Sequence, residues 1–496
     1  MKYYLAIDQG TSGTTALLVE ASTFRFIDKV TQEHPQFYPS PGQVEHCLTE
    51  IWKSVRESVT SLLVKTNSNA NDIIGIGIAN QRETTCAFDR DGNPLARAIV
   101  WQDRRTANFC KQIICDGNQD LFRTKTGLPI DPYFSATKIH WLLNNNEKVK
   151  AANQKDKVLF GTIDTYLTFK LTGGKSHVTE MSNASRTMLM NLNTGQWDDD
   201  LLKYFNINKS CLPTIQDTFG HFGITHGLDF LPDNIPISCL FGDQQSALFG
   251  QACIMPGTIK CTYGTGAFLL LNTGDKIVYS KCGLLSTAAY SYRGQRQYAL
   301  EGSCYIAGAA VQWLRDNLKI IKSSDEIEAL AKQVSNLAEM EFIYFLPFFT
   351  GIGSPYWVSD AKAALLGLTR DSGHHHIARA CLEGICFSIN DLIQTMRNDS
   401  GLLVTNLKVD GGAVVNNLLM TMQATISNLK IVRPRVIETT AYGAALGAAI
   451  GLGNLQIEGI SHLWEEDKVF DRNSEWIDYF SAKYNGWTKV IKKLYL

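Results

Sequence analysis

The sequence has 496 residues, of which 45% are hydrophobic and 19% are charged, and its formal net charge is −1. This is an ordinary globular composition, and the length predicts two or more domains because single hydrophobic cores stop growing near about 250–300 residues. The neutral balance excludes the basic surplus of nucleic-acid-binding proteins, and no apolar run approaches the ~20 residues of a membrane span. We therefore expect no nucleic-acid partner and no membrane insertion.

The twelve cysteines are scattered along the chain, and none of them forms a Cys-x-x-Cys pair. Several lie in apolar surroundings, as Cys239, Cys261 and Cys381 do. This usage is typical of reduced core residues, so we expect a cytoplasmic protein whose cysteines form neither disulfides nor a metal site.

The first predicted elements form a hairpin. Residues 3–7 are an apolar strand that leads to Asp8, and a second strand resumes at residues 16–19. The turn between them, residues 10–13, contains glycine, threonine and serine. Glycines let the backbone approach a ligand, and successive N–H groups with hydroxyls form an anion-binding nest. A plain hairpin turn uses the same residues, and this alternative stays open here.

Two later strands end in polar runs. An apolar helix face at residues 51–63 precedes a strand at 73–78, which ends in the polar run 80–84. A strand at 98–101 ends in the polar run 102–105. Because α/β sheets bind ligands at the carboxyl ends of their strands, these runs indicate a binding crevice.

The midpoint of the chain carries the strongest catalytic candidate. An apolar run at residues 235–241 leads to Asp243 and then to a short amphipathic run, which predicts a strand, a turn and a helix with Asp243 as the N-cap. The N–H groups of a helix start would keep such a carboxylate ionised. An ionised, fixed carboxylate is what a general base for an alcohol needs, although Asp243 could equally be only a cap.

The second half repeats the first hairpin. Strands at 258–263 and 267–271 flank the turn 264–266, which again contains glycine and threonine. Two such hairpins indicate a duplicated architecture with a cleft between the halves. We place the domains at residues 1–250 and 251–496.

Two further segments of the second half are compatible with a nucleotide. A helix rich in small residues covers 306–315, and a strand at 407–410 leads through Gly411-Gly412 into a helix from residue 414. A strand, a glycine pair and a helix N-terminus together form a recurrent phosphate-binding element.

In this order, the segments resemble the FGGY family of carbohydrate kinases over essentially the whole chain. The resemblance is carried by long motifs at residues 8–11, 76–84, 99–105, 127–135, 183–188, 242–245, 263–266 and 409–414. It implies an α/β fold of two actin-like (ribonuclease-H-like) ATPase domains with the catalytic cleft between them. It also implies ATP and Mg²⁺ as cofactors and the phosphorylation of glycerol to sn-glycerol 3-phosphate. We expect a homodimer or homotetramer.

The resemblance also assigns roles to individual residues. Asp243 takes the proton of the glycerol hydroxyl, and Trp101 and Phe268 sandwich the carbon backbone. The residues implied to contact the substrate are Arg82, Glu83, Trp101, Tyr133, Asp243, Gln244 and Phe268. Those implied to bind the nucleotide are Thr11, Ser12, Gly13, Thr15, Thr265, Gly266, Gly308, Gln312, Gly412 and Asn416. Asp8 and Asp243 would hold Mg²⁺ through water, because Mg²⁺ keeps much of its hydration shell.

One position departs from the family pattern, and two other functions compete. Thr15 stands where the pattern has an arginine. One rival is an FGGY kinase for another polyol or a pentulose, and the second is a non-catalytic actin-like ATPase. The Arg82-Glu83 pair with Trp101 and Tyr133 favours glycerol. A ketose kinase would need more room beside Trp101, and a non-catalytic ATPase has no reason to keep the polyol set.

Overall fold

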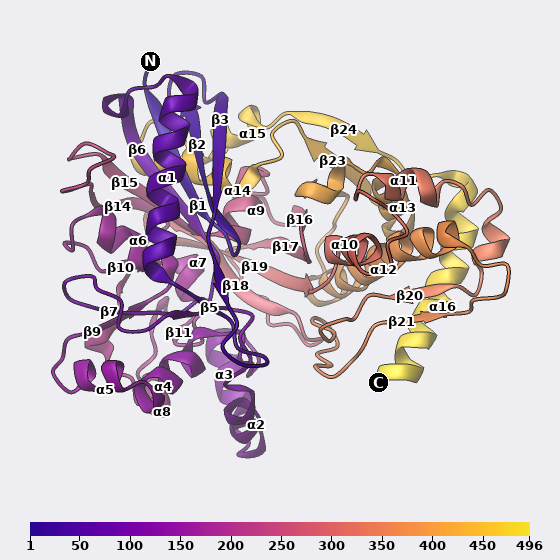
Figure 1. The fold of residues 1–496 in the computed structure, drawn as a ribbon, viewed down its shortest axis with the longest axis horizontal. Coiled ribbons are helices and arrows are strands. Elements are labelled where there is room, and N and C mark those ends of the chain that lie inside the picture. The colour runs from indigo at the N-terminus through magenta and orange to yellow at the C-terminus, as the bar shows by residue number, and fades with distance from the viewer.

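The structure, a computed structural model, describes residues 1–496 and has two large sheets lying side by side (Figure 1). The first sheet has six strands in the spatial order β14 (Phe219–Ile224), β15 (Pro236–Gly242), β6 (Ile73–Asn80), β1 (Tyr3–Gln9), β2 (Gly13–Glu20) and β3 (Phe26–Glu33). The second has seven, in the order β18 (Leu285–Tyr292), β19 (Gln295–Cys304), β17 (Ala267–Gly274), β16 (Ile259–Tyr263), β22 (Asn406–Asp410), β23 (Lys430–Pro434) and β24 (Glu466–Phe470).

The two sheets share one pairing pattern. In the first, β1 is antiparallel to β2 and parallel to β6, and β6 is parallel to β15. In the second, β16 is antiparallel to β17 and parallel to β22, and β22 is parallel to β23. In each sheet, the first strand of a hairpin therefore also pairs in parallel with a later strand, and that strand pairs in parallel with a third. The duplicated architecture that the hairpins predicted is confirmed, and the chain has the two-domain fold expected of actin-like kinases.

Helices cover the faces of both sheets. The α-helices are α1 (Leu48–Thr66), α2 (Ala107–Cys115), α3 (Gln119–Thr126), α4 (Ser135–Asn145), α5 (Glu147–Asn153), α6 (Ile163–Leu171), α7 (Met181–Ala184), α8 (Asp199–Phe205), α9 (Asp243–Gly250), α10 (Gly308–Asp316), α11 (Glu326–Ala331), α12 (His374–Ser400), α13 (Asn417–Ser427), α14 (Thr439–Gly451), α15 (Ile460–Leu463) and α16 (Ile477–Tyr495). Strand β1 has the alternation expected of a strand with helices on both faces, since Leu5 and Ile7 join the core with α1 whereas Tyr4 and Ala6 join the core with α14.

Short strands complete the fold and mostly form small ribbons. They are β4 (Gln36–Phe37), β5 (Glu45–His46), β7 (Cys86–Asp89), β8 (Ala98–Ile99), β9 (Val158–Gly161), β10 (Val178–Glu180), β11 (Met190–Asn191), β12 (Gln196–Trp197), β13 (Thr214–Gln216), β20 (Tyr344–Leu346) and β21 (Ala364–Leu366). The strand predicted at 98–101 is therefore shorter than expected, and the helix expected from residue 414 starts only at Asn417, after a 3₁₀ turn.

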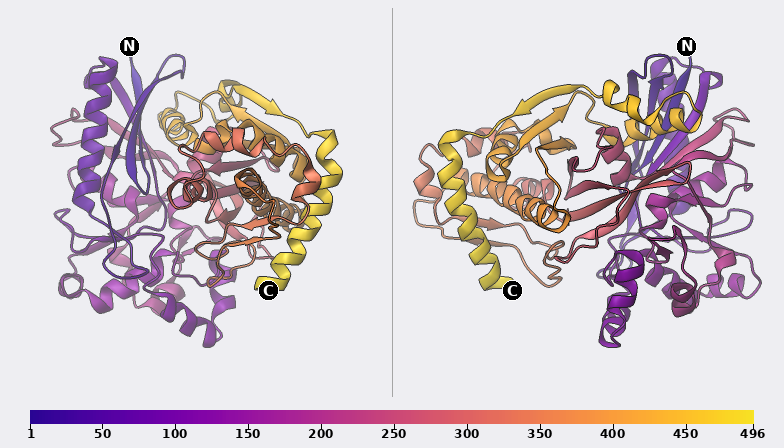
Figure 2. Two further views of the ribbon diagram at one scale, coloured as in Figure 1. Left: turned by 45° about the vertical axis from the view of Figure 1, so that its right-hand side comes forward. Right: turned by 180° about the vertical axis from the view of Figure 1, so that it is seen from behind.

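Helix α14 connects the two halves. It follows β23 of the second sheet in the chain but packs on β1, β6 and β15 of the first sheet, where Figure 2 (right) shows yellow helices beside the indigo strands. It also crosses α9 at close range, because a Cβ at Gly443 would lie 2.2 Å from the backbone oxygen of Ser246. Glycine is therefore required at this crossing. The division of the chain at residue 250 stays a prediction.

Two further findings concern the chain as a whole. None of the helices has both the length and the apolar character that a membrane crossing requires. All twelve cysteines are free thiols, and most are buried, as expected of core residues.

Candidate active site

A cavity of about 390 Å³ lies between the two hairpin turns and is lined by residues of both halves. We call it the central cavity. The predicted residues that it brings together are Thr11, Ser12, Arg82, Glu83, Trp101, Tyr133, Asp243, Gln244, Thr265, Gly266 and Phe268. Segments more than two hundred residues apart in sequence thus meet in one small space. Gln102 and Gly264, which belong to the predicted polar run 102–105 and the predicted turn 264–266, also line it, as do Gln36, Tyr38, Thr262 and Tyr305, which the sequence did not single out.

A second cavity, of about 510 Å³, opens beside the first and shares Gly264 and Thr265 with it. We call it the side cavity. It is lined by four further predicted residues, Gly308, Gln312, Gly412 and Asn416. Because the two cavities meet at the turn between β16 and β17, one elongated ligand can occupy the side cavity and reach the central one. Gly13 and Thr15 line neither of these two cavities.

Asp243 is the first residue of α9, and Gly242 is the N-cap, so the predicted capping position was wrong by one residue. The Asp243 Oδ1 atom accepts a hydrogen bond from its neighbour's backbone, Gln244 N, at 2.6 Å, and lies 3.2 Å from Arg82 Nε. Burial raises the pKa of Asp243, although Arg82 and Lys260 oppose this shift. The helix start therefore does not keep Asp243 strongly acidic, and a carboxylate of raised pKa is the stronger base.

Asp8 lies near the end of β1, where the charge of Asp243 acts on it, but it lines neither the central nor the side cavity. Burial raises the pKa of Asp8 well above its ordinary value, and the charges of Asp243 and Glu438 raise it further. Two ionised carboxylates this close repel each other, and a cation bound near both would reduce that repulsion. No cluster of three histidine, cysteine or acidic side chains gathers into a metal cage anywhere in the structure.

A buried ion network connects Arg82 and Glu83 of the central cavity with Arg186 and Glu301. The Arg82 guanidinium donates to both carboxylate oxygens of Glu301, with Nη2 to Oε1 at 2.9 Å. Arg186 donates from Nε to Glu83 Oε1 at 2.6 Å and from Nη2 to Glu301 Oε1 at 3.1 Å. All four side chains are at most 2% exposed. Because Glu301 belongs to β19, the network joins the two halves of the chain.

Glu83 also has an unusual backbone. Its φ is +59°, in the left-handed region that non-glycine residues seldom occupy. Its carbonyl oxygen accepts hydrogen bonds from Ser135 Oγ at 3.0 Å and from Lys138 Nζ at 3.2 Å. Such a conformation persists where the surroundings fix it, and strained residues of this kind cluster at binding sites.

Trp101, Tyr133 and Phe268 meet with their rings nearly perpendicular, and we call this group the aromatic corner. Trp101 and Phe268 have ring centroids 6.2 Å apart with planes at 81°, and Trp101 and Tyr133 are 5.6 Å apart at 82°. The two rings meet edge to face, and their predicted sandwiching of the substrate's carbon backbone stays a prediction. Trp101 Nε1 donates to Thr11 Oγ1 at 2.9 Å, which holds the indole against the first hairpin turn.

Thr15 lies on the same strand pair as Asp8. The two are register partners on β2 and β1, so their side chains share a face of the sheet. Thr15 Oγ1 exchanges a hydrogen bond with Thr31 Oγ1 at 2.8 Å on the neighbouring strand. A neighbouring cation, Lys29, pairs with Glu438, and its charge lowers the pKa of Asp8 against the larger effect of burial.

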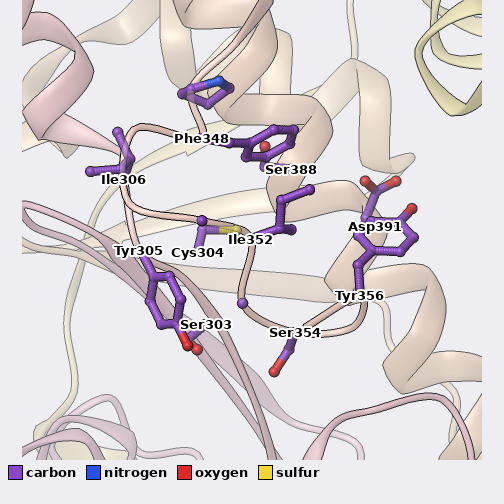
Figure 3. A pocket seen from close by; sticks show the side chains of 13 residues that line it. Ser303, Cys304, Tyr305, Ile306, Phe348, Ile352, Ser354, Tyr356, Ser388 and Asp391 are labelled. Carbon is purple, nitrogen blue, oxygen red and sulfur yellow. The ribbon is translucent and has the colours of Figure 1, made fainter. Parts of the chain in front are cut away.

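Tyr305 lines both the central cavity and a small hollow, which is shown in Figure 3. This hollow of about 20 Å³ is lined by Ser354, Tyr356 and Asp391 among others, and has room for a single water. Burial raises the pKa of Asp391 to about 6, although hydrogen bonds from Trp487 and other side chains oppose the shift. The hollow is too small to hold a substrate.

Three residues that contact the lining of the central cavity received no role from the sequence: Arg186, which lies within the motif 183–188, Glu301 and Lys260. Each is a fully buried charge, and Lys260 and Glu301 stand next to buried apolar residues of their strands, Lys260 between Ile259 and Cys261 and Glu301 after Ala299 and Leu300. A charged residue inside an apolar strand is itself a signal, because buried charges need partners.

Comparison with known proteins finds matches that cover nearly the whole chain. Models of the FGGY family of carbohydrate kinases match the chain, the N-terminal domain over residues 3–250 and the C-terminal domain over residues 259–452. A glycerol kinase of Listeria innocua is 43% identical over 99% of this chain and 98% of its own length. A glycerol kinase of Myxococcus xanthus is 46% identical over 95% of each chain.

Solved structures extend the comparison to the fold. The crystal structure of Plasmodium falciparum glycerol kinase with ADP superposes with a TM-score of 0.89 at 36% identity, over 99% of this chain and 98% of that one. A ligand-bound xylulose kinase from Lactobacillus acidophilus gives 0.87 at 22% identity, over 100% and 98%. At that identity the second match shows the fold alone.

Proposed function

The chain belongs to the FGGY family of carbohydrate kinases, and we propose that it transfers the terminal phosphoryl group of ATP to glycerol, giving sn-glycerol 3-phosphate. The observation that carries this function is the convergence of Arg82, Glu83, Tyr133 and Asp243 in one cavity beside the second hairpin turn. Glycerol kinases 43–46% identical over nearly the whole chain support the same conclusion.

We assign the base to Asp243. Its carboxylate would accept the proton of the hydroxyl that is phosphorylated, so that the oxygen attacks the γ-phosphorus and the β–γ bridging oxygen leaves with ADP. Burial, which raises the pKa of Asp243, strengthens it as a base, and the nearby Arg82 guanidinium limits that rise. Phosphoryl transfer otherwise depends mainly on positioning and charge neutralisation.

The residues present fit a magnesium ion. Mg²⁺ binds through one or two carboxylates together with substrate phosphates and water, and the mutual repulsion of Asp8 and Asp243 creates such a place. When bound, the ion would neutralise charge on the phosphates. Asp8 and Asp243 are the side chains we propose to hold it, through water.

Nucleotide binding follows from the shape of the two cavities. We propose that the base and ribose occupy the side cavity, lined by Gly308, Gln312, Gly412 and Asn416. The phosphates would then reach the central cavity, which Thr11 and Ser12 of the first hairpin turn line together with Thr265 and Gly266 of the second. Gly13, which follows Ser12 in the first turn, would contribute through its backbone.

Substrate choice rests on the aromatic corner and the ion network. Arg82, Glu83 and Tyr133 offer hydrogen bonds to a polyol in a site whose buried polar groups would stay unpaired with a wrong ligand. Trp101 and Phe268 narrow the space that a pentulose would need. Among kinases of this family, this arrangement favours glycerol over a longer sugar.

A substrate panel tests this function. We expect a higher kcat/KM for glycerol than for xylulose or ribulose in a coupled ADP-release assay. Trp101→Ala should raise KM for glycerol by at least about tenfold, because one apolar contact in a pocket is worth ~1–3 kcal/mol. The control is Trp141→Ala on α4, whose ring contacts Arg105 away from the cavity. A pentulose with the higher kcat/KM would replace glycerol as the substrate, and ATP hydrolysis that no acceptor stimulates would favour the rival actin-like ATPase.

Thr15 gives a second test. Thr15→Arg adds a cation on the face of the sheet that carries Asp8. A charge-assisted hydrogen bond from this arginine to the nucleotide is worth about 1.5–3 kcal/mol, so KM for ATP should fall by about ten- to a hundred-fold. Thr31→Val, which removes the partner hydroxyl without adding charge, should leave KM for ATP unchanged. If Thr15→Arg also leaves it unchanged, Lys29 or another cation already supplies the charge.

Three broader assignments stay proposals. We infer that residues 1–250 and 251–496 are separate domains, which family matches at 3–250 and 259–452 support. We also propose a cytoplasmic homodimer or homotetramer, and sedimentation of the purified chain measures that state directly.

A further inference from the structure

Two consecutive glutamines at the start of α9 have opposite surroundings. Gln245 has both ends of its amide occupied, since Oε1 accepts from Arg82 Nη1 at 3.1 Å while Nε2 donates to Thr287 Oγ1 at 3.2 Å and Ala288 O at 3.1 Å. Gln244 has only its oxygen occupied, by Lys260 Nζ at 2.5 Å. Its Nε2 group donates to no protein atom, and Gln244 lines the central cavity. Gln245 is therefore structural, whereas Gln244 presents a free donor.

Lys260 decides which end of the Gln244 amide faces the cavity. It lies on β16, is 0% exposed, and also donates to Thr262 Oγ1 at 2.7 Å. An ammonium has three donors and no acceptor, so only Oε1 of the amide can face it. Nε2 must then point away from Lys260. The carboxylates of Asp410 and Asp243 favour the charged ammonium, although burial lowers the pKa of Lys260.

We propose that Lys260 is a positioning residue that fixes the Gln244 amide so that its Nε2 donates, and only donates, to a hydroxyl oxygen of the substrate. This inference rests on the proposed function. A substrate hydroxyl whose oxygen accepts this hydrogen bond still has its own proton to donate to a carboxylate. Glu83 and Asp243, which line the central cavity, are the carboxylates available there. Lys260 thus sets the direction of one hydrogen bond in substrate recognition without touching the substrate itself.

A double-mutant cycle on KM for glycerol tests the proposal. Lys260→Met keeps the length of the side chain and removes the ammonium, and we expect KM for glycerol to rise about tenfold, the loss of one hydrogen bond. Gln244→Ala should give a rise of the same size, and the double variant no further rise. KM for ATP should stay within about twofold, because Lys260 does not line the side cavity.

Lys408 offers a matched control. It is the register partner of Lys260 on β22, and its Nζ donates to Gln251 O at 2.7 Å, away from the cavity. Lys408→Met should leave both KM values unchanged. If Lys260→Met leaves KM for glycerol unchanged, or if the two single effects multiply in the double variant, the proposal is overturned while the proposed function stands.

A second variant keeps the test decisive if Lys260→Met does not fold. Gln244→Glu retains an oxygen for Lys260 but replaces the donor with a second acceptor, so KM for glycerol should rise at least as much as in Gln244→Ala. Wild-type KM in a folded Gln244→Glu variant would refute the donor assignment. A wild-type chain that does not turn over glycerol would instead contradict the proposed function itself.

Discussion

Asp243→Asn is expected to lower kcat with glycerol by about 10²–10⁴-fold, the usual cost of losing a general base. The amide keeps the shape of the carboxylate but cannot accept the hydroxyl proton. The loss should appear in kcat more than in KM, because the proton moves only in the transition state. Steady-state kinetics with saturating glycerol and ATP measure it, and ATP binding by calorimetry shows whether the cleft is intact.

The fold supplies a matched control for this substitution. Asp199 is the first residue of α8, as Asp243 is of α9, but its side chain is 84% exposed and pairs only with Lys209. Asp199→Asn should therefore have nearly wild-type kcat, which separates the loss of a helix-start charge from the loss of a base. If a folded Asp243→Asn variant turns over glycerol at the wild-type rate, another group takes the proton.

The parts of the site that the sequence predicted well are those that local patterns define. The turn 10–13 and the turn 264–266 each lie between two strands, and the pairing of each hairpin depends on a few neighbouring residues. Asp243 was found because an apolar strand leads directly into a helix there. The predicted N-cap was still wrong by one residue, because the backbone geometry at the helix boundary decides whether Gly242 or Asp243 is the cap.

The parts that escaped prediction depend on contacts between distant segments. Glu301 is 219 residues from Arg82 along the chain, and nothing near either residue specifies the pairing. The position of α14 is a similar case, because its small, apolar residues fit any close helix crossing, and only the folded chain places it on the first sheet. The angle between Trp101 and Phe268 is likewise set by packing.

Loss of the Glu301 carboxylate should also destabilise the fold. Its carboxylate is fully buried and accepts hydrogen bonds from both Arg82 and Arg186. A buried ion pair is a weak source of net stability, but removing one partner leaves the other charges uncompensated at a cost of about 3–5 kcal/mol. Glu301→Gln should lower the free energy of unfolding by an amount in this range, and raise KM for glycerol because Arg82 loses its anchor.

The pH dependence of this effect has a definite sign. Burial raises the pKa of Glu301, but Arg186 and Arg82 outweigh it, so the pKa in the folded chain lies below its ordinary value. The carboxylate therefore contributes stability above the pKa of an unfolded glutamate, near about 4.3, and this contribution is lost as the pH falls through the lower, folded-state pKa. Denaturant unfolding at pH 7 and at pH 4 should show the difference between wild type and Glu301→Gln shrinking at the lower pH.

Glu465→Gln is the control for Glu301→Gln, because Glu465 pairs with Arg435 at 2.8 Å on the surface, where its side chain is 62% exposed. A surface pair of this kind contributes about 0–1 kcal/mol, so its removal should change the unfolding midpoint little at either pH. If Glu301→Gln behaves like Glu465→Gln, the two arginines find other acceptors, and the network does not hold the two halves of the cleft together. If instead Glu301→Gln lowers stability equally at both pH values, the lost contribution is one of packing and not of charge.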